Sequence, residues 1–138
     1  MKYQKKVLIV CSDYYSIISN NLLKDAIKRL DIAKIKTNII KVPGVFEVPF
    51  VIGKNIHKYD GFVALGCVIK GQTPHFDFIS KASINGIMNL SIEHKKPIGN
   101  GILTCLTMNQ AITRSSHKGN KRKGKEAAEA LISVLKIK

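Results

Sequence analysis

Apolar residues occur along the chain in four short, nearly continuous runs that are separated by longer segments. The runs are rich in Val and Ile and cover residues 6–11, 36–42, 61–69 and 98–105. Strands that are covered on both faces of a parallel sheet have this continuous pattern, whereas strands with one solvent-exposed face alternate apolar and polar residues. We therefore expect four buried strands at these positions.

The segments outside the runs repeat their apolar residues every three or four positions, which is typical of amphipathic helices. We expect helices over residues 17–30, 46–57, 76–90 and 125–136. In the second of these, Pro49 is acceptable because it falls in the first turn. Strands and helices thus alternate along the whole chain, which predicts an α/β fold with a mainly parallel sheet and helices on both faces.

Length and composition are those of one globular domain that covers residues 1–138, with 45% hydrophobic residues. No apolar run approaches the roughly 20 residues that a membrane span needs, so we expect no membrane association. The run at 7–11 is also short for a signal-peptide core. The three cysteines, Cys11, Cys67 and Cys105, form no CxxC pair, which favours free thiols in a cytoplasmic protein.

The charge is strongly positive, because 23 Lys and Arg residues oppose nine Asp and Glu residues and give a net charge of +14. The lysines outside residues 117–125 are scattered along the chain, some of them on expected helix faces, where lysine favours solvation. Residues 117–125 form a basic cluster that could bind phosphates, acidic partners or RNA. This cluster contains no aromatic residue, so we do not expect a nucleic acid partner.

Unusual residues follow each of the four expected strands, in segments 12–15, 42–47, 70–76 and 105–110. The carboxyl ends of parallel strands meet at one edge of a sheet, and open α/β sheets bind ligands outside these ends. The sequence therefore predicts a ligand site at this edge.

Several side chains at this edge have a possible chemical role and a simpler structural one. Tyr14 and Tyr15 could stack on a planar ring, or one of them could simply cover the start of the first helix. Glu47 could accept hydrogen bonds from ligand hydroxyls or cap the second helix. In the sequence GQTPH, we expect Gly71 to free the turn, while Gln72, Thr73 and backbone N–H groups face an anion. His75 could then transfer protons near neutral pH or serve as a helix cap.

The sequences VPGVFEVP (42–49), ALGCVIKGQTPHFDFI (64–79), PIGNGILTCLTMNQAITRS (97–115) and NKRKGKEAAEA (120–130) resemble 6,7-dimethyl-8-ribityllumazine synthases. The resemblance extends from about Val7 to the C-terminus. It implies a three-layer α/β/α sandwich with a four-stranded, mainly parallel, flavodoxin-like sheet. It also implies a transferase of riboflavin biosynthesis that condenses 5-amino-6-(D-ribitylamino)uracil with 3,4-dihydroxy-2-butanone 4-phosphate and releases phosphate and water.

The resemblance implies roles for individual residues. His75 matches the proton-transfer histidine of the family. The residues that match the ribitylaminouracil site are Tyr14, Val45, Phe46, Glu47, Cys67, Val68, Ile69 and Asn100. The residues that match the phosphate site are Gln72, Thr73 and Arg114. No histidine is spaced with a second ligand type as a metal site requires, and we expect neither a metal nor an organic cofactor.

Asn100 matches a position that contacts the pyrimidine from a neighbouring subunit, although many members have an aromatic residue there. The resemblance therefore implies a homo-oligomer, a pentamer or a multiple of pentamers, with active sites between subunits. The segment after Arg114 is about one residue longer than in capsid-forming members, which favours a pentamer or decamer over a 60-subunit capsid. Two alternatives share the scaffold: a non-catalytic lumazine or flavin binder, and an archaeal-type riboflavin synthase.

Overall fold

A computed structural model describes residues 3–117 and 122–137. Its sheet has four parallel strands in the order β2-β1-β3-β4, namely β1 (Lys6–Ser12), β2 (Lys36–Val42), β3 (Gly61–Ile69) and β4 (Ile98–Cys105). In register, Ile9 of β1 lies between Ile39 of β2 and Val63 of β3. The four predicted strands and their parallel arrangement are confirmed.

The expected burial holds for the central strands and is wrong for β2. Every residue of β1 after Lys6 is buried, and β3 is buried from Gly61 to Cys67. In β2, Val42 alone is buried among its seven residues, all of which the structure describes. This strand lies at an edge of the sheet, where a strand is covered less completely than in the centre.

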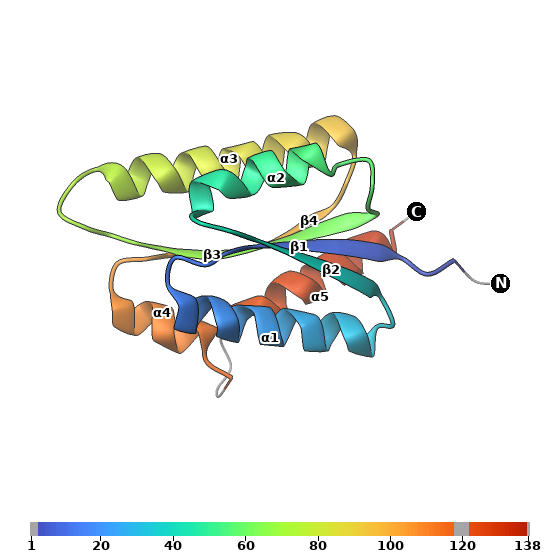
Figure 1. Ribbon diagram of the computed structural model, residues 1–138, viewed down its shortest axis with the longest axis horizontal. Coiled ribbons are helices and arrows are strands. Elements are labelled where there is room, and N and C mark those ends of the chain that lie inside the picture. The colour runs from blue at the N-terminus through green and yellow to red at the C-terminus, as the bar shows by residue number, and fades with distance from the viewer. Residues whose placement is uncertain (1–2, 118–121, 138) are drawn as a thin grey trace.

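Helices cover both faces of the sheet and make three layers (Figure 1). On one face lie α1 (Ser16–Ile32), α4 (Met108–Ser115) and α5 (Lys123–Leu135), and on the other lie α2 (Val48–Lys54) and α3 (His75–His94). A short 3-10 helix, η1 (Val45–Glu47), leads into α2. The α/β/α sandwich with a flavodoxin-like sheet is thereby confirmed.

Helix α4 was not among the predicted helices. The side-chain oxygen of Thr107 accepts a hydrogen bond from the backbone N–H of Gln110 at 3.2 Å. The side chain of Gln110 in turn accepts one from the backbone N–H of Leu106 at 2.8 Å. The pattern Thr-x-x-Gln resembles a capping box, so the sequence did contain a signal for the start of this helix.

The alternation of side chains along β1 divides the core into two clusters. Val7, Ile9 and Cys11 pack toward α1 and α5, whereas Leu8 and Val10 pack toward α2 and α3. Full burial of an aliphatic side chain contributes about 1.5–3 kcal/mol of transfer free energy. Both clusters therefore stabilise the strands whose ends form the predicted site.

The outer face of α3 is solvent-exposed and carries several large apolar side chains among polar ones. Ser83 and Ile87 are the buried residues of this helix, all 20 residues of which the structure describes. Phe78, Met88 and Ile92 of α3 are exposed, and so are Phe46 of η1 and Phe50 of α2, two elements that contact α3. An exposed apolar patch of this kind is typical of a protein–protein interface.

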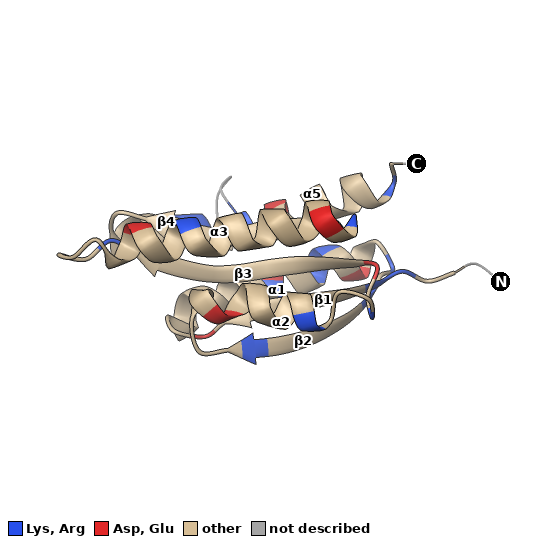
Figure 2. Ribbon diagram, turned by 90° about the horizontal axis from the view of Figure 1, so that it is seen from above, with Lys and Arg blue, Asp and Glu red and all other residues tan. Residues whose placement is uncertain are grey.

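No helix within residues 3–117 and 122–137 has the length and apolar character needed to cross a membrane. Lysines and arginines are distributed over several helices and β2 and are not confined to one element (Figure 2). Residues 118–121 of the basic cluster lie outside the described residues.

Candidate active site

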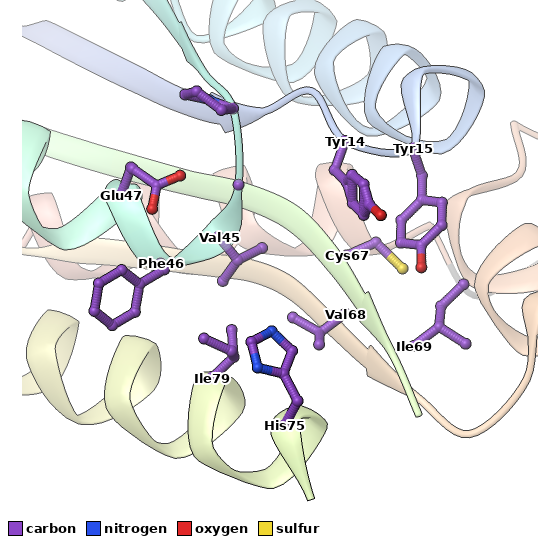
Figure 3. Close-up of a pocket in the computed structure, with 12 residues that line it drawn as sticks. Tyr14, Tyr15, Val45, Phe46, Glu47, Cys67, Val68, Ile69, His75 and Ile79 are labelled. Atoms are coloured by element: carbon purple, nitrogen blue, oxygen red, sulfur yellow. The ribbon is translucent and has the colours of Figure 1, made fainter. Parts of the chain in front are cut away.

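A cavity of about 720 Å³ lies at the carboxyl ends of β1, β2 and β3. Its volume is in the range of small-molecule sites. The residues that line it are Tyr14, Tyr15, Pro43, Gly44, Val45, Phe46, Glu47, Cys67, Val68, Ile69, His75 and Ile79 (Figure 3). Three of the four segments singled out by position in the sequence thus contribute to one cavity.

Two tyrosines form one wall of this cavity. The ring centroids of Tyr14 and Tyr15 lie 4.9 Å apart, with the rings tilted by 49°. Tyr15 is the N-cap residue of α1 and packs partly against the core, whereas Tyr14 is 72% exposed. Tyr15 therefore covers the helix start, and the ring of Tyr14 is accessible to a planar ligand.

The turn from Gly44 to Glu47 forms the opposite wall. Glu47 precedes α2, but its side chain makes no capping hydrogen bond. A Cβ atom on Gly44 would lie 3.1 Å from Oε1 of Glu47, so the carboxylate folds back over this glycine. The absence of a side chain at position 44 leaves room for a carboxylate that can accept hydrogen bonds within the cavity.

The end of β3 contributes the apolar side chains of Cys67, Val68 and Ile69. Cys67 is 4% exposed. Burial, with a smaller contribution from Cys105, raises the pKa of the Cys67 thiol to about 12. This thiol is therefore protonated at neutral pH and acts as an apolar contact surface, because a thiol nucleophile must first ionise.

His75 is the first residue of α3, and its imidazole points into the cavity near Val68 and Ile79 (Figure 3). The backbone N–H of His75 donates a hydrogen bond to Oγ1 of Thr73 at 3.4 Å. This bond lies in the turn before α3 and does not involve the imidazole, which is available to a ligand.

Gln72 and Thr73 are exposed in the turn before α3 and lie beside the cavity without lining it. The expected role of Gly71 in this turn is not supported. Its φ lies outside the left-handed region, and a Cβ atom there would meet no atom within 4 Å. A residue with a side chain would fit this position.

Arg114 and Asn100 do not line the cavity that contains His75. Arg114 belongs to α4, on the face of the sheet opposite α3, and its Nη1 donates to Sγ of Cys105 at 3.8 Å. Asn100 lies on the edge strand β4, where its Oδ1 accepts from the backbone N–H of Ile102 at 3.0 Å. One chain by itself does not bring these two residues to the imidazole.

Arg114 lines a second cavity, of about 320 Å³, with Ile102, Leu103, Thr104, Lys123 and Glu126. Two cations and one carboxylate therefore face this cavity. Neither Lys123 nor Glu126 was among the predicted site residues, although Lys123 belongs to the basic cluster. Ile79 of the first cavity was also missed, and its position four residues after His75 on a helix was a usable signal.

Within the described part of the chain, no group of three or more His, Cys, Asp and Glu side chains is arranged to hold a metal ion. The first cavity combines an aromatic ring, a carboxylate, an apolar strand end and an imidazole. This set can bind a planar ring with a hydroxylated substituent and transfer protons to it.

Comparison with known proteins identifies the family. The model of the 6,7-dimethyl-8-ribityllumazine synthase family matches residues 4–138. The chain is 40% identical to a 6,7-dimethyl-8-ribityllumazine synthase of Bartonella tribocorum over 100% of the chain and 93% of that protein. It is 38% identical to one of Methylobacterium radiotolerans, over 96% of the chain and 82% of the relative. It is 36% identical to one of Aliarcobacter butzleri, over 99% of the chain and 88% of the relative. The chain belongs to the 6,7-dimethyl-8-ribityllumazine synthase family.

Proposed function

We propose that this chain condenses 5-amino-6-(D-ribitylamino)uracil with 3,4-dihydroxy-2-butanone 4-phosphate at the cavity that contains His75. The products would be 6,7-dimethyl-8-ribityllumazine, phosphate and water, which makes the chain a transferase of riboflavin biosynthesis. The observation that carries this proposal is the convergence of Tyr14, Glu47 and His75 on one cavity of suitable size.

The ribitylaminouracil would occupy the length of the cavity. The ring of Tyr14 stacks on the pyrimidine, and Cys67, Val68 and Ile69 contact its edge from the end of β3. Val45 and Phe46 enclose the ribityl chain, and the carboxylate of Glu47 accepts hydrogen bonds from its hydroxyl groups. Asn100 of a neighbouring subunit approaches the pyrimidine from the open side.

The butanone phosphate would bind at the start of α3. Gln72, Thr73 and the N-terminus of the helix contact the phosphate, because exposed N–H groups and the helix dipole favour an anion there. Arg114 of a neighbouring subunit adds a planar, permanently charged guanidinium that can bind a phosphate with two hydrogen bonds.

The chemistry follows from holding the two substrates together. The amine of the uracil attacks the ketone, and the resulting carbinolamine loses water to give an imine. Elimination of phosphate leaves an enol that tautomerises to a ketone, and the second nitrogen attacks this carbonyl carbon and closes the ring with loss of a second water. His75 donates and accepts the protons of these steps. Positioning supplies a large share of the acceleration, since bound partners react as one molecule.

The separation of Arg114 and Asn100 from His75 supports a homo-oligomer whose active sites lie between subunits. The exposed apolar face of α3 offers the surface for such contacts. A homopentamer, or a multiple of pentamers, fits these features. The three buried free cysteines favour a cytoplasmic location, and the single sheet favours one domain over residues 1–138.

The decisive experiment mixes the two substrates with the purified protein and follows the fluorescence of the lumazine product. We expect the protein to raise the rate of lumazine formation above the rate without protein. We expect His75→Ala to reduce this rate. Binding of a lumazine or flavin without product formation would contradict the proposal and identify a non-catalytic binder.

A further inference from the structure

The carboxylate of Asp25 is a buried acidic group outside the first cavity. Asp25 lies on α1, and its side chain is 3% exposed. It accepts hydrogen bonds from Nδ1 of His117 at 2.9 Å and from Nε and Nη2 of Arg122 at 3.2 and 2.7 Å. The two donors are 92 and 97 residues away in the sequence, so this contact joins distant parts of the chain.

The electrostatics of this contact favour an ionised carboxylate. Burial raises the pKa of Asp25, but hydrogen bonds from Arg122 and then from His117 outweigh it, and the pKa lies below its ordinary value. The same contact raises the pKa of Arg122. The geometry is that of a charge-assisted pair in which two guanidinium nitrogens donate to one carboxylate.

The two donors, His117 and Arg122, lie near the two ends of the connection between α4 and α5. His117 follows Arg114 by three residues, and Arg122 directly precedes Lys123. Arg114 and Lys123 line the same cavity of about 320 Å³. One carboxylate therefore fixes the chain next to both cations of this cavity.

An independent contact places the start of α5 against α1, about one helical turn from Asp25. Gly124 approaches α1 so closely that a Cβ atom on it would lie 2.2 Å from the backbone oxygen of Leu22. Leu22 precedes Asp25 by three residues, which is about one helical turn. Lys123 thus lies between two residues that are held against α1, namely Arg122 and Gly124.

We infer that Asp25 is a positioning residue: it holds Arg114 and Lys123 at the relative position in which both contact the phosphate of the butanone substrate. It acts through His117 and Arg122 and touches no substrate itself. This inference rests on the proposed role of Arg114 in phosphate binding. A group that fixes charged contacts in this way changes substrate affinity because binding groups must be held close to their productive geometry.

The test is steady-state kinetics of the full-length protein, with each substrate varied in turn. Asp25→Asn keeps the shape of the side chain but removes its charge and places an amide N–H group against donors. We expect KM for the butanone phosphate to rise roughly tenfold, with kcat and KM for the uracil changed less than about twofold. Asp60→Asn is the matched control, because Asp60 accepts hydrogen bonds from the backbone N–H of Lys6 and the hydroxyl of Tyr3, both near the start of β1.

Arg114→Ala is measured in parallel, so that the proposed phosphate contact of Arg114 and the proposed positioning role of Asp25 are tested separately. If Arg114→Ala raises KM for the butanone phosphate and Asp25→Asn does not, the inference is overturned while the phosphate assignment stands. If Arg114→Ala leaves this KM unchanged, the phosphate assignment fails and the inference fails with it. Equal changes of both KM values in Asp25→Asn would reduce Asp25 to a structural role.

A second variant covers the case in which Asp25→Asn does not fold. Arg122→Gln changes a side chain that is 28% exposed and leaves the hydrogen bond from His117 to Asp25 in place. We expect a smaller rise of the same KM, roughly threefold. An unchanged KM for the butanone phosphate in this variant would overturn the inference.

Discussion

The backbone N–H of His75 donates a hydrogen bond to the side-chain oxygen of Thr73 at 3.4 Å. His75 is the first residue of α3 and carries the imidazole that points into the cavity. Thr73, which is proposed to bind the phosphate, is therefore hydrogen-bonded to the backbone of His75, which is proposed to transfer protons.

Thr73→Val should weaken this link. The variant removes the acceptor oxygen of a long, exposed hydrogen bond and keeps the branched shape, so we expect the free energy of unfolding to fall by no more than about 0.5 kcal/mol. KM for the butanone phosphate should rise, because the lost hydroxyl is proposed to contact the phosphate. Thr73→Ser retains the hydroxyl and is the control. Denaturant unfolding and steady-state kinetics measure the two effects, and identical behaviour of the valine and serine variants would contradict them.

His75→Ala should slow turnover without abolishing it. Loss of a general acid–base group costs roughly 10²- to 10⁴-fold in rate, while binding and positioning of both substrates remain. Single-turnover measurement of lumazine formation at saturating substrate concentrations isolates the chemical step. Phe76→Leu, at the next position of α3, is the control for changes in the helix. An unchanged rate in His75→Ala would exclude the imidazole from proton transfer.

Arg114→Ala should act selectively on one substrate. The lost guanidinium contacts are worth about 1.5–3 kcal/mol for a hydrogen bond between charged groups, which corresponds to a rise of roughly 10- to 100-fold in KM for the butanone phosphate. KM for the uracil should change little. Arg114→Lys keeps the charge and loses the planar geometry, so its KM for the butanone phosphate should lie between those of the parent protein and Arg114→Ala. Equal losses for both substrates would argue against a phosphate contact.

Cys67 should make stability depend on alkaline pH. The pKa of its thiol is raised to about 12 in the folded protein and is about 8.5 in an unfolded chain. The unfolded state therefore loses a proton first as pH rises, and the stability contributed by the thiol below about pH 8.5 is lost progressively up to about pH 12. Cys67→Ala removes this contribution at every pH.

The measurement is urea unfolding of the parent and Cys67→Ala at about pH 8 and about pH 10. We expect the parent to lose about 2 kcal/mol more than the variant over this interval, because 1.5 pH units correspond to about that free energy. Parallel pH dependence in the two proteins would show that the thiol ionises as readily in the folded state as in the unfolded chain.

Met88→Glu should disrupt the proposed assembly. Met88 is 56% exposed on the apolar face of α3, and a charge buried in a subunit interface costs several kcal/mol. We expect a lower mass in analytical ultracentrifugation and loss of lumazine formation, since Arg114 of a neighbour would no longer reach the cavity. Val134→Glu makes the same change at a residue of α5 that is 48% exposed, on the other face of the sheet. Full activity of a monomeric Met88→Glu protein would contradict a shared active site.

The four strands, the parallel sheet and the edge at which the cavity lies could all be predicted from the pattern of residues along the chain. Continuous apolar runs separated by helical periodicity leave few ways to bury both faces of each strand, and parallel strands must end on the same side. The residues that follow these strands, from Tyr14 to His75, could therefore be placed near one another before the fold was known. Burial of β2 was overestimated because its segment KTNIIKV was counted as an apolar run, although Lys36, Thr37, Asn38 and Lys41 are polar, as suits an edge strand.

Which residues lie apart and which distant ones meet could not be predicted in this way, because it depends on how the elements pack against one another. The tertiary structure placed Arg114 on a separate helix, α4, facing a second cavity, although the segment after β4 was expected at the same edge. It also joined Asp25 to His117 and Arg122 across more than 90 residues. Local periodicity records which side of an element is buried, but contacts between elements depend on how they pack, and no spacing in the chain encodes that.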